Sequence, residues 1–135
     1  AMIPIGTALQ TTGLSDVISS NISLLAADMS LFWLLFLILI ITMATTDIIN
    51  NAATAVIMAP ISAGIGLELG YAIEPFLMVV AVGASCAFLT PIGHQCNTVV
   101  MGPGNYKFTD YWRLGLPLDI LIIAVSIPMI LFVWT

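Results

Sequence analysis

Charged residues are scarce in this chain, and that scarcity excludes most soluble proteins. Only 7% of its 135 residues are charged, whereas soluble domains carry roughly 25%. Hydrophobic residues make up 61% of the sequence and recur up to its last residues, which also excludes a signal peptide followed by a soluble domain. The composition therefore predicts a protein of the lipid bilayer.

Basic residues are the rarest charged group. Two Lys and Arg residues stand against seven Asp and Glu residues, so the net charge of −5 arises from a lack of cations rather than from an acidic patch. Binding to a nucleic acid needs clustered cations that neutralise phosphates. We therefore expect no nucleic-acid partner.

Residue patterns that carry catalysis or hold transition metals are missing too. The two cysteines, Cys86 and Cys96, have neither zinc spacing nor a CxxC arrangement, and we interpret them as ordinary small core residues. The sequence shows no nucleophile–base pair, metal cluster or phosphate-cradling loop. We therefore expect neither an enzyme nor a bound organic cofactor.

Long uninterrupted hydrophobic runs are few, because polar or Gly/Pro-rich sequence breaks most of them. Irregular chain inside a bilayer survives only within protein or along a wet cavity, and interrupted segments point to a transporter's binding site. We predict an all-α membrane protein with an interfacial amphipathic helix at 7–28, a re-entrant hairpin at 31–67, a broken helix at 76–105 and a last transmembrane span at 114–134. So few spans cannot enclose a polar pathway, and we expect part of a longer protein or one unit of an assembly.

The hairpin tip is predicted at residues 46–54, which read TDIINNAAT. A helix ending there exposes carbonyl oxygens that carry roughly half a negative charge, and the carboxylate of Asp47 costs about 2.5–3.5 kcal/mol in the membrane interior unless a cation lies beside it. The returning helix, expected to start around Ala52, directs free N–H groups at the same region and favours an anion. Asn50 and Asn51 offer both donors and acceptors. The tip is thus expected to hold a cation and an anion side by side.

The break in the second helix is predicted at residues 90–97, which read TPIGHQCN. Gly93 frees backbone carbonyls, and Asn97 is expected to cap a short helix that begins at Thr98. No Lys or Arg lies near either break. A cation-coupled anion site needs none, because the ion brings the positive charge with it. We expect the two breaks to meet.

The two basic residues predict an orientation. Lys107 and Arg113 flank the same interfacial turn, 107–113, before the last span. Because Lys and Arg favour cytoplasmic loops, we place this turn on the cytoplasmic side of the cell (inner) membrane and the C-terminus outside.

Two stretches carry a family resemblance: TDIINNAATAVIMAPI at 46–61 and GASCAFLTPIGHQCNTVVMGPGNY at 83–106. They resemble the C-terminal repeat of the divalent-anion:sodium symporter family, within the wider superfamily of citrate-transporter-like permeases. The resemblance implies two inverted repeats per protomer, each with a re-entrant hairpin and an unwound helix, and a homodimer. This chain would supply one inverted-repeat half, packed against the N-terminal repeat of the same protein.

The resemblance also implies which residues touch the substrate. The family's Ser-Asn-Thr triad at the tip matches Asn50, Asn51 and Ala52 here. The Thr-Pro pair that contacts substrate in the dicarboxylate branch matches His94 and Gln95. The strings TPIGHQCN and GPGNY are closer to the branch often linked to sulfate, so an inorganic oxyanion is the first expectation and a dicarboxylate the second.

A cation site is implied at the same place. By the same carry-over, Thr46, Asn51 and the Gly93 carbonyl line one sodium site. Asp47 and Asn97 join these candidates because of their place in the two breaks. Sodium is thus the expected coupling ion and no transition metal is expected.

The leading hypothesis is sodium-coupled uptake of a small divalent anion by an elevator-type movement. One alternative keeps the fold but makes the protein a proton-coupled exchanger or metalloid-efflux relative, with Asp47 and His94 as titrating groups. Another is a non-transporting membrane assembly subunit, in which Asn50 and Asn51 only bond helices together. His94 could equally be a polar loop residue, and Asp119 is interpreted as a capping or snorkelling group.

Overall fold

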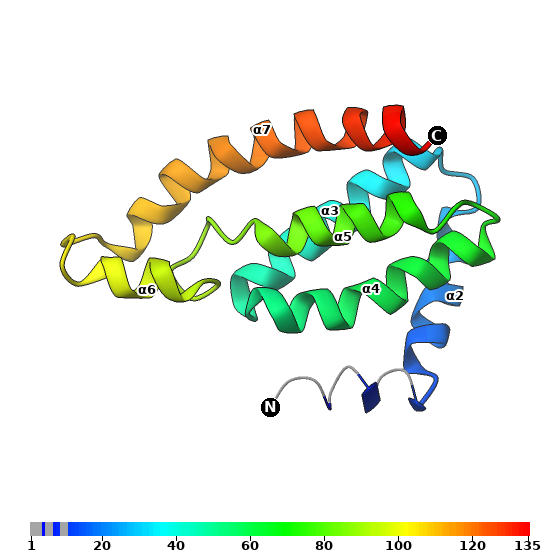
Figure 1. The fold of residues 1–135 in the computed structure, drawn as a ribbon, viewed down its shortest axis with the longest axis horizontal. Helices are drawn as coiled ribbons and strands as arrows, with labels where there is room; N and C mark the ends of the chain where they lie inside the picture. The colour runs from blue at the N-terminus through cyan, green and yellow to red at the C-terminus, as the bar shows by residue number, and fades with distance from the viewer. Residues whose placement is uncertain (1–3, 5–6, 9–10) are drawn as a thin grey trace.

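The computed structural model describes residue 4, residues 7–8 and residues 11–135, and the described part is all-helical with no strand. This confirms the all-α prediction for those residues, while residues 9–10 of the expected first helix lie outside the described part. The helices are α2 (Leu14–Ala26), α3 (Leu31–Ile48), α4 (Asn51–Glu68), α5 (Glu74–Ser85), α6 (Gln95–Met101) and α7 (Phe108–Trp134) (Figure 1).

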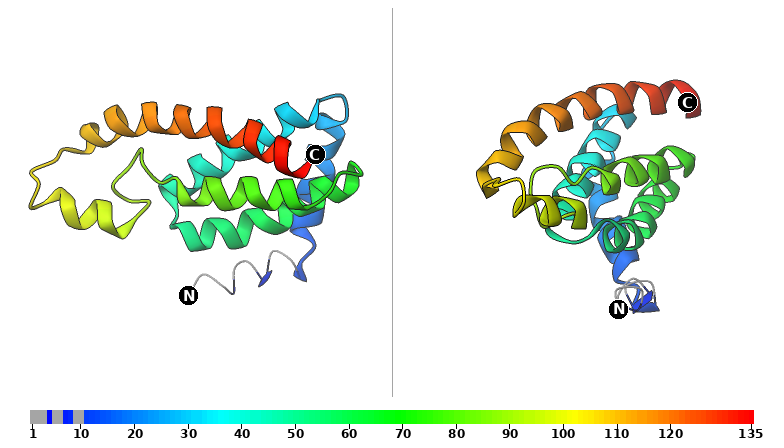
Figure 2. Two further views of the ribbon diagram at one scale, coloured as in Figure 1. Left: turned by 45° about the horizontal axis from the view of Figure 1, so that its top comes forward. Right: turned by 60° about the vertical axis from the view of Figure 1, so that its left-hand side comes forward.

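Three helices, α3, α4 and α5, form the body of the fold, and α7 packs on α3 and α5 (Figures 1 and 2). Short connections make α4 antiparallel to both of its sequence neighbours, so α3 and α5 run in the same direction. The C-terminal ends of α3 and α5 therefore lie at the same end of the molecule as the N-terminus of α4. Beyond that end, the chain continues through α6 before α7 returns along the body.

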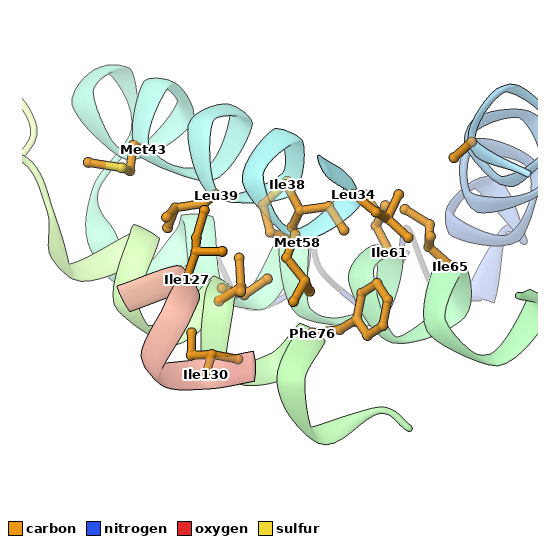
Figure 3. Packing of buried hydrophobic residues seen from close by; sticks show 14 of the residues in the cluster. Leu34, Ile38, Leu39, Met43, Met58, Ile61, Ile65, Phe76, Ile127 and Ile130 are labelled. Carbon is orange, nitrogen blue, oxygen red and sulfur yellow. The ribbon is translucent and has the colours of Figure 1, made fainter. Parts of the chain in front are cut away.

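The core is apolar, and α3, α4, α5 and α7 all contribute side chains to it (Figure 3). Its fully buried members include Leu34 and Leu39 of α3, Ile65 of α4 and Phe76 of α5. Burying side chains of this size stabilises the fold by roughly 1.5–3 kcal/mol each. This packing fixes the position of the polar helix ends.

Two helices are long and apolar enough to cross a bilayer among the described residues: α3 with 18 residues and α7 with 27. At ~1.5 Å per residue α7 exceeds the ~30 Å hydrocarbon core, whereas α5, with 12 residues, reaches only part of the way. Many large apolar side chains on the outer faces are exposed, such as Leu114 and Phe132 of α7. An apolar exterior is what a lipid environment requires.

The helix α2 presents its polar face inward. Ser15, Ser19 and Ser23 are buried, while Leu24 and Leu25 are 78% and 83% exposed. The segment is amphipathic as expected, but the serines pack toward α4. Small residues allow two helices to approach closely, and this face attaches α2 to the hairpin. Its place at the membrane interface stays a prediction.

Two expected boundaries differ in the structure. The non-helical segment between α5 and α6, here called the break, runs from residue 86 to residue 94 rather than from 90 to 97. The helix α7 begins at Phe108, so most of the expected turn at 107–113 is helical. A capping interaction explains this early start, because the Asp110 carboxylate accepts a 2.8 Å hydrogen bond from the Lys107 amide.

Candidate functional site

The candidate site lies where three helix ends meet. Only Ile49 and Asn50 separate α3 from α4, and both have extended backbones. The Thr46 hydroxyl, in the last turn of α3, donates a 2.9 Å hydrogen bond to the carbonyl of Ala84, in the last turn of α5. Two helix C-termini, with their partial negative charge, and one N-terminus, with its partial positive charge, thus converge.

The side chain of Asn51 lies at the centre of this junction. One of its amide atoms is 2.9 Å from Thr46 Oγ1 and 3.2 Å from each of the carbonyl oxygens of Ala84 and Gly93. The orientation that satisfies the surrounding hydrogen bonds places nitrogen there, and its two protons are then shared among the three acceptors. If that atom is oxygen, four oxygens face one another, with only the single proton of Thr46 to share among them.

This donor set fits a hard cation such as sodium. Carbonyl and hydroxyl oxygens are the ligands that hard cations prefer, and unwound carbonyls with helix C-termini are the usual sodium ligands in transporters of interrupted-helix design. The oxygens of Thr46, Asn51, Ala84 and Gly93 would hold the ion. We call these four residues the oxygen cluster.

Asp47 ties the hairpin tip to the break. Its side chain is 5% exposed. One carboxylate oxygen accepts a 3.2 Å hydrogen bond from the Leu89 amide, and the Thr90 hydroxyl donates a 2.6 Å hydrogen bond to the main-chain oxygen of Asp47. The other carboxylate oxygen has no hydrogen-bond partner among the described residues. A buried carboxyl group with one unpartnered oxygen therefore lies next to Thr46 of the oxygen cluster.

Gly93 brings the break against the tip by its lack of a side chain. A Cβ at this position would lie 2.7 Å from the Thr46 carbonyl oxygen and 2.7 Å from the Ala87 Cβ. Real Cβ atoms do not approach other atoms so closely. The carbonyl of residue 93 reaches Asn51 only because glycine occupies the position.

The expected cap of the short helix is corrected by the structure. The helix α6 begins at Gln95, and His94 is its N-cap, with Nδ1 accepting a 3.2 Å hydrogen bond from the Cys96 amide. Asn97 instead lies inside the helix and donates to the Ala87 carbonyl at 2.9 Å. Asn97 therefore braces the break, because its amide satisfies a carbonyl that the unwound chain leaves free.

The residues expected to contact substrate surround the oxygen cluster. Asn50 is the N-cap of α4, and its side-chain oxygen accepts a 2.8 Å hydrogen bond from the Ala53 amide. That bond leaves its exposed amide nitrogen available to an anion. The neighbouring Ala52 is also exposed. His94 and Gln95 are exposed and follow Gly93 in sequence, but no hydrogen bond joins them to the tip among the described residues.

Sequence reasoning missed three polar groups in the segments that form the site. The Ala84 carbonyl belongs to the last turn before the break, a position at which carbonyls are left free. Thr90 is the first residue of the predicted break, and the sequence gives no signal that its hydroxyl would reach Asp47. Thr54, one turn into α4, is fully buried, and its hydroxyl has no hydrogen-bond partner among the described residues.

Known transporters are similar to this chain along most of its length. The family model described as the sodium:sulfate symporter transmembrane region matches residues 1–135. An uncharacterized transporter of Synechocystis sp. is 38% identical over 96% of this chain and 21% of its own length. The sodium/sulfate cotransporter 2 of Chlamydomonas reinhardtii is 28% identical over 93% of this chain and 14% of its own length.

A relative that is named for a different substrate also matches. The sodium-dependent high-affinity dicarboxylate transporter 3 of Caenorhabditis elegans is 29% identical over 87% of this chain and 21% of its own length. The chain thus spans about a fifth of the length of its curated relatives. The match of the family model along the whole chain shows that it belongs to the sodium:sulfate symporter transmembrane family, a family of transporters.

Proposed function

We propose that this chain is the C-terminal repeat of a secondary active carrier that moves a small divalent anion together with sodium. One observation carries the proposal: the hairpin tip and the break are hydrogen-bonded to each other and present oxygens and N–H donors side by side. A protein that only anchored other subunits would have no need for two adjacent interruptions, since each leaves backbone groups that lipid cannot satisfy.

Sodium binds first in this scheme, at the oxygen cluster. With the Asn51 amide turned so that its oxygen faces inward, the ion takes the place that the amide nitrogen otherwise fills between Thr46, Ala84 and Gly93. Asp47 adds a negative charge at close range, which favours a cation in a medium of low dielectric constant. The ion then supplies the positive charge that the anion needs.

The anion binds on the exposed side of the tip. The N-terminus of α4 offers free N–H groups at Asn51 and Ala52, and the side-chain nitrogen of Asn50 points away from its own cap bond. Because His94 accepts a hydrogen bond at Nδ1, its Nε2 carries the proton in the neutral ring and can donate to an anion. Gln95 supplies a further amide. We propose a sulfate-like oxyanion or a dicarboxylate as the substrate class.

The proposed topology follows the sequence analysis. The helices α3 and α4 form a re-entrant hairpin, and together with the broken helix they move as one body past the N-terminal repeat in an elevator-type cycle. The turn before α7 lies on the cytoplasmic side of the inner membrane and the C-terminus outside. Two protomers form a homodimer.

Uptake by the whole protein in proteoliposomes tests the proposal. We expect labelled sulfate or a dicarboxylate to accumulate when sodium is added outside, and not when choline replaces sodium. Asn51→Ala should abolish this uptake. Asn21→Ala, the same change at an exposed residue bonded within its own helix, should leave it intact. Uptake that ignores the sodium gradient and follows a pH gradient would instead establish proton coupling.

A further inference from the structure

The last helix carries a buried carboxylate that the proposed site does not use. Asp119 is 7% exposed, and one of its oxygens has no hydrogen-bond partner among the described residues. Because α7 begins at Phe108, Asp119 lies about three turns inside the helix. It therefore does not cap the helix, one of the two roles that the sequence-based interpretation allowed.

Asp119 lies beside Asp47. Gly115, one turn earlier on the same face of α7, is so close to the break that a Cβ there would lie 2.5 Å from the Phe88 oxygen and 3.1 Å from the Leu89 nitrogen. The same Leu89 nitrogen donates to the Asp47 carboxylate. Both helices thus contact Leu89, α3 through Asp47 and α7 through Gly115, and no hydrogen bond joins the two carboxylates among the described residues.

No positive group of the chain compensates this pair. Lys107 and Arg113 are the only basic residues in the sequence, and both are exposed. The single histidine, His94, is exposed and caps α6. Among the described residues, the buried thiol of Cys86 is a further ionisable group in this region, and it brings no positive charge. Two buried carboxylates repel each other and lose their hydration, so the pair either takes up a proton or holds a cation from solution.

We propose that Asp47 and Asp119 bind a second sodium ion between α3 and α7, separate from the oxygen cluster. Each carboxylate has an unpartnered buried oxygen to offer, and carboxylate oxygens are ligands of hard cations. This inference rests on the proposed sodium-coupled function and extends it. The ion would join α7 to the hairpin tip, so the last helix and the break would move with the hairpin.

The test is thermal unfolding of the whole purified protein in sodium chloride and in choline chloride at equal ionic strength. For the wild type, the unfolding temperature should rise with sodium. Asp119→Asn removes one repelling charge, so this variant should unfold at a higher temperature than the wild type without sodium, and most of its sodium-dependent rise should be lost. A merely structural role would not give these opposite effects in the two salts.

Two further variants make the result specific. Asp28→Asn makes the same chemical change at an exposed turn residue and should respond to sodium like the wild type. If Asp119→Asn does not fold, Asp119→Leu, of similar size and also uncharged, is measured in its place. A wild-type sodium response in the Asp119 variant would overturn the second site.

The failure of the second site can be told apart from the failure of the proposed function. If the wild type itself shows neither sodium-dependent unfolding nor sodium-driven uptake, the carrier function fails and the second site fails with it. If the wild type responds and Asp119→Asn does so equally, only the second site fails. If both sodium sites exist, Asn51→Ala should lose uptake but keep part of the sodium-dependent rise in unfolding temperature.

Discussion

The hydroxyl of Thr90 donates a 2.6 Å hydrogen bond to the main-chain oxygen of Asp47, and this bond joins the break after α5 to the last turn of α3. The acceptor is one of the carbonyls that a helix C-terminus leaves without an intrahelical partner. An unpaired carbonyl buried in a bilayer costs several kcal/mol. The unwound segment therefore stabilises the hairpin tip, and the tip in turn holds the segment out of the helical conformation.

Replacing Thr90 with Val should loosen this junction. The variant keeps the shape of the side chain but removes the donor, which should lower the free energy of unfolding by about 1–3 kcal/mol and weaken sodium binding. The measurement is unfolding at several sodium concentrations. Thr45→Val is the matched control, since the Thr45 hydroxyl bonds only within its own helix, to Ile41. Equal losses of stability and of sodium binding in both variants would show that the Thr90 bond does not hold the break to the tip.

A methyl group at position 93 should separate the break from the tip. Gly93→Ala places a Cβ 2.7 Å from the Thr46 carbonyl oxygen, so the backbone must shift, at a cost of about 1–3 kcal/mol. Because the shift moves a carbonyl of the oxygen cluster, we expect sodium-driven uptake to be lost. Gly102→Ala is the control, because nothing lies within 4 Å of a Cβ there. Normal uptake by Gly93→Ala would contradict the role of its carbonyl.

Asn50 can be tested for substrate binding apart from its role as a cap. Asp caps a helix as well as Asn does, so Asn50→Asp should preserve stability, whereas Asn50→Ala should lose about 1 kcal/mol. The new carboxylate repels an anion at the N-terminus of α4. We therefore expect Asn50→Asp to lose anion uptake while its unfolding temperature still rises with sodium. Anion uptake at the wild-type level would place the substrate elsewhere.

The sequence predicted the helical interruptions because their signals are local. A carboxylate and two amides in TDIINNAAT, and a Pro and a Gly in TPIGHQCN, favour an interruption of a membrane helix, although α4 continues through Pro60 and α7 through Pro117 and Pro128. The role of Asn50 as N-cap of α4 also follows from local sequence, since Asn is a preferred N-cap. These features depend on a few adjacent residues, and in the structure α3 ends at Ile48 and α4 begins at Asn51, within TDIINNAAT.

The features that the sequence could not predict depend on packing. His94 and Asn97 are both compatible with a cap, and only the contacts of the break assign the cap to His94 and a bracing bond to Asn97. Asp119 stands near the start of the predicted last span, which suggested a capping or snorkelling group, but α7 begins at Phe108, so Asp119 does not cap it. Its burial beside Asp47 follows from the way Gly115 packs on the break, which the pattern of α7 alone does not encode.

The attachment of α2 to the hairpin gives the last prediction. The Ser23 hydroxyl donates a 2.5 Å hydrogen bond to the Glu68 carboxylate at the far end of α4, and Ser19 packs against Gly64. Ser23→Ala should lower the free energy of unfolding by about 1 kcal/mol. Ser20→Ala is the control, because the Ser20 hydroxyl bonds only to Val17 of its own helix.

The effect of Ser23→Ala on transport should be different from its effect on stability. Its bond lies at the opposite end of α4 from the oxygen cluster, so the concentration of sodium that gives half-maximal uptake should stay unchanged. If α2 only stabilises the hairpin, the maximal uptake per folded molecule should also stay unchanged. A changed rate at an unchanged sodium requirement would mean that the serine face of α2 contributes to the movement of the hairpin, because only the mobility of α4 against α2 would have been altered.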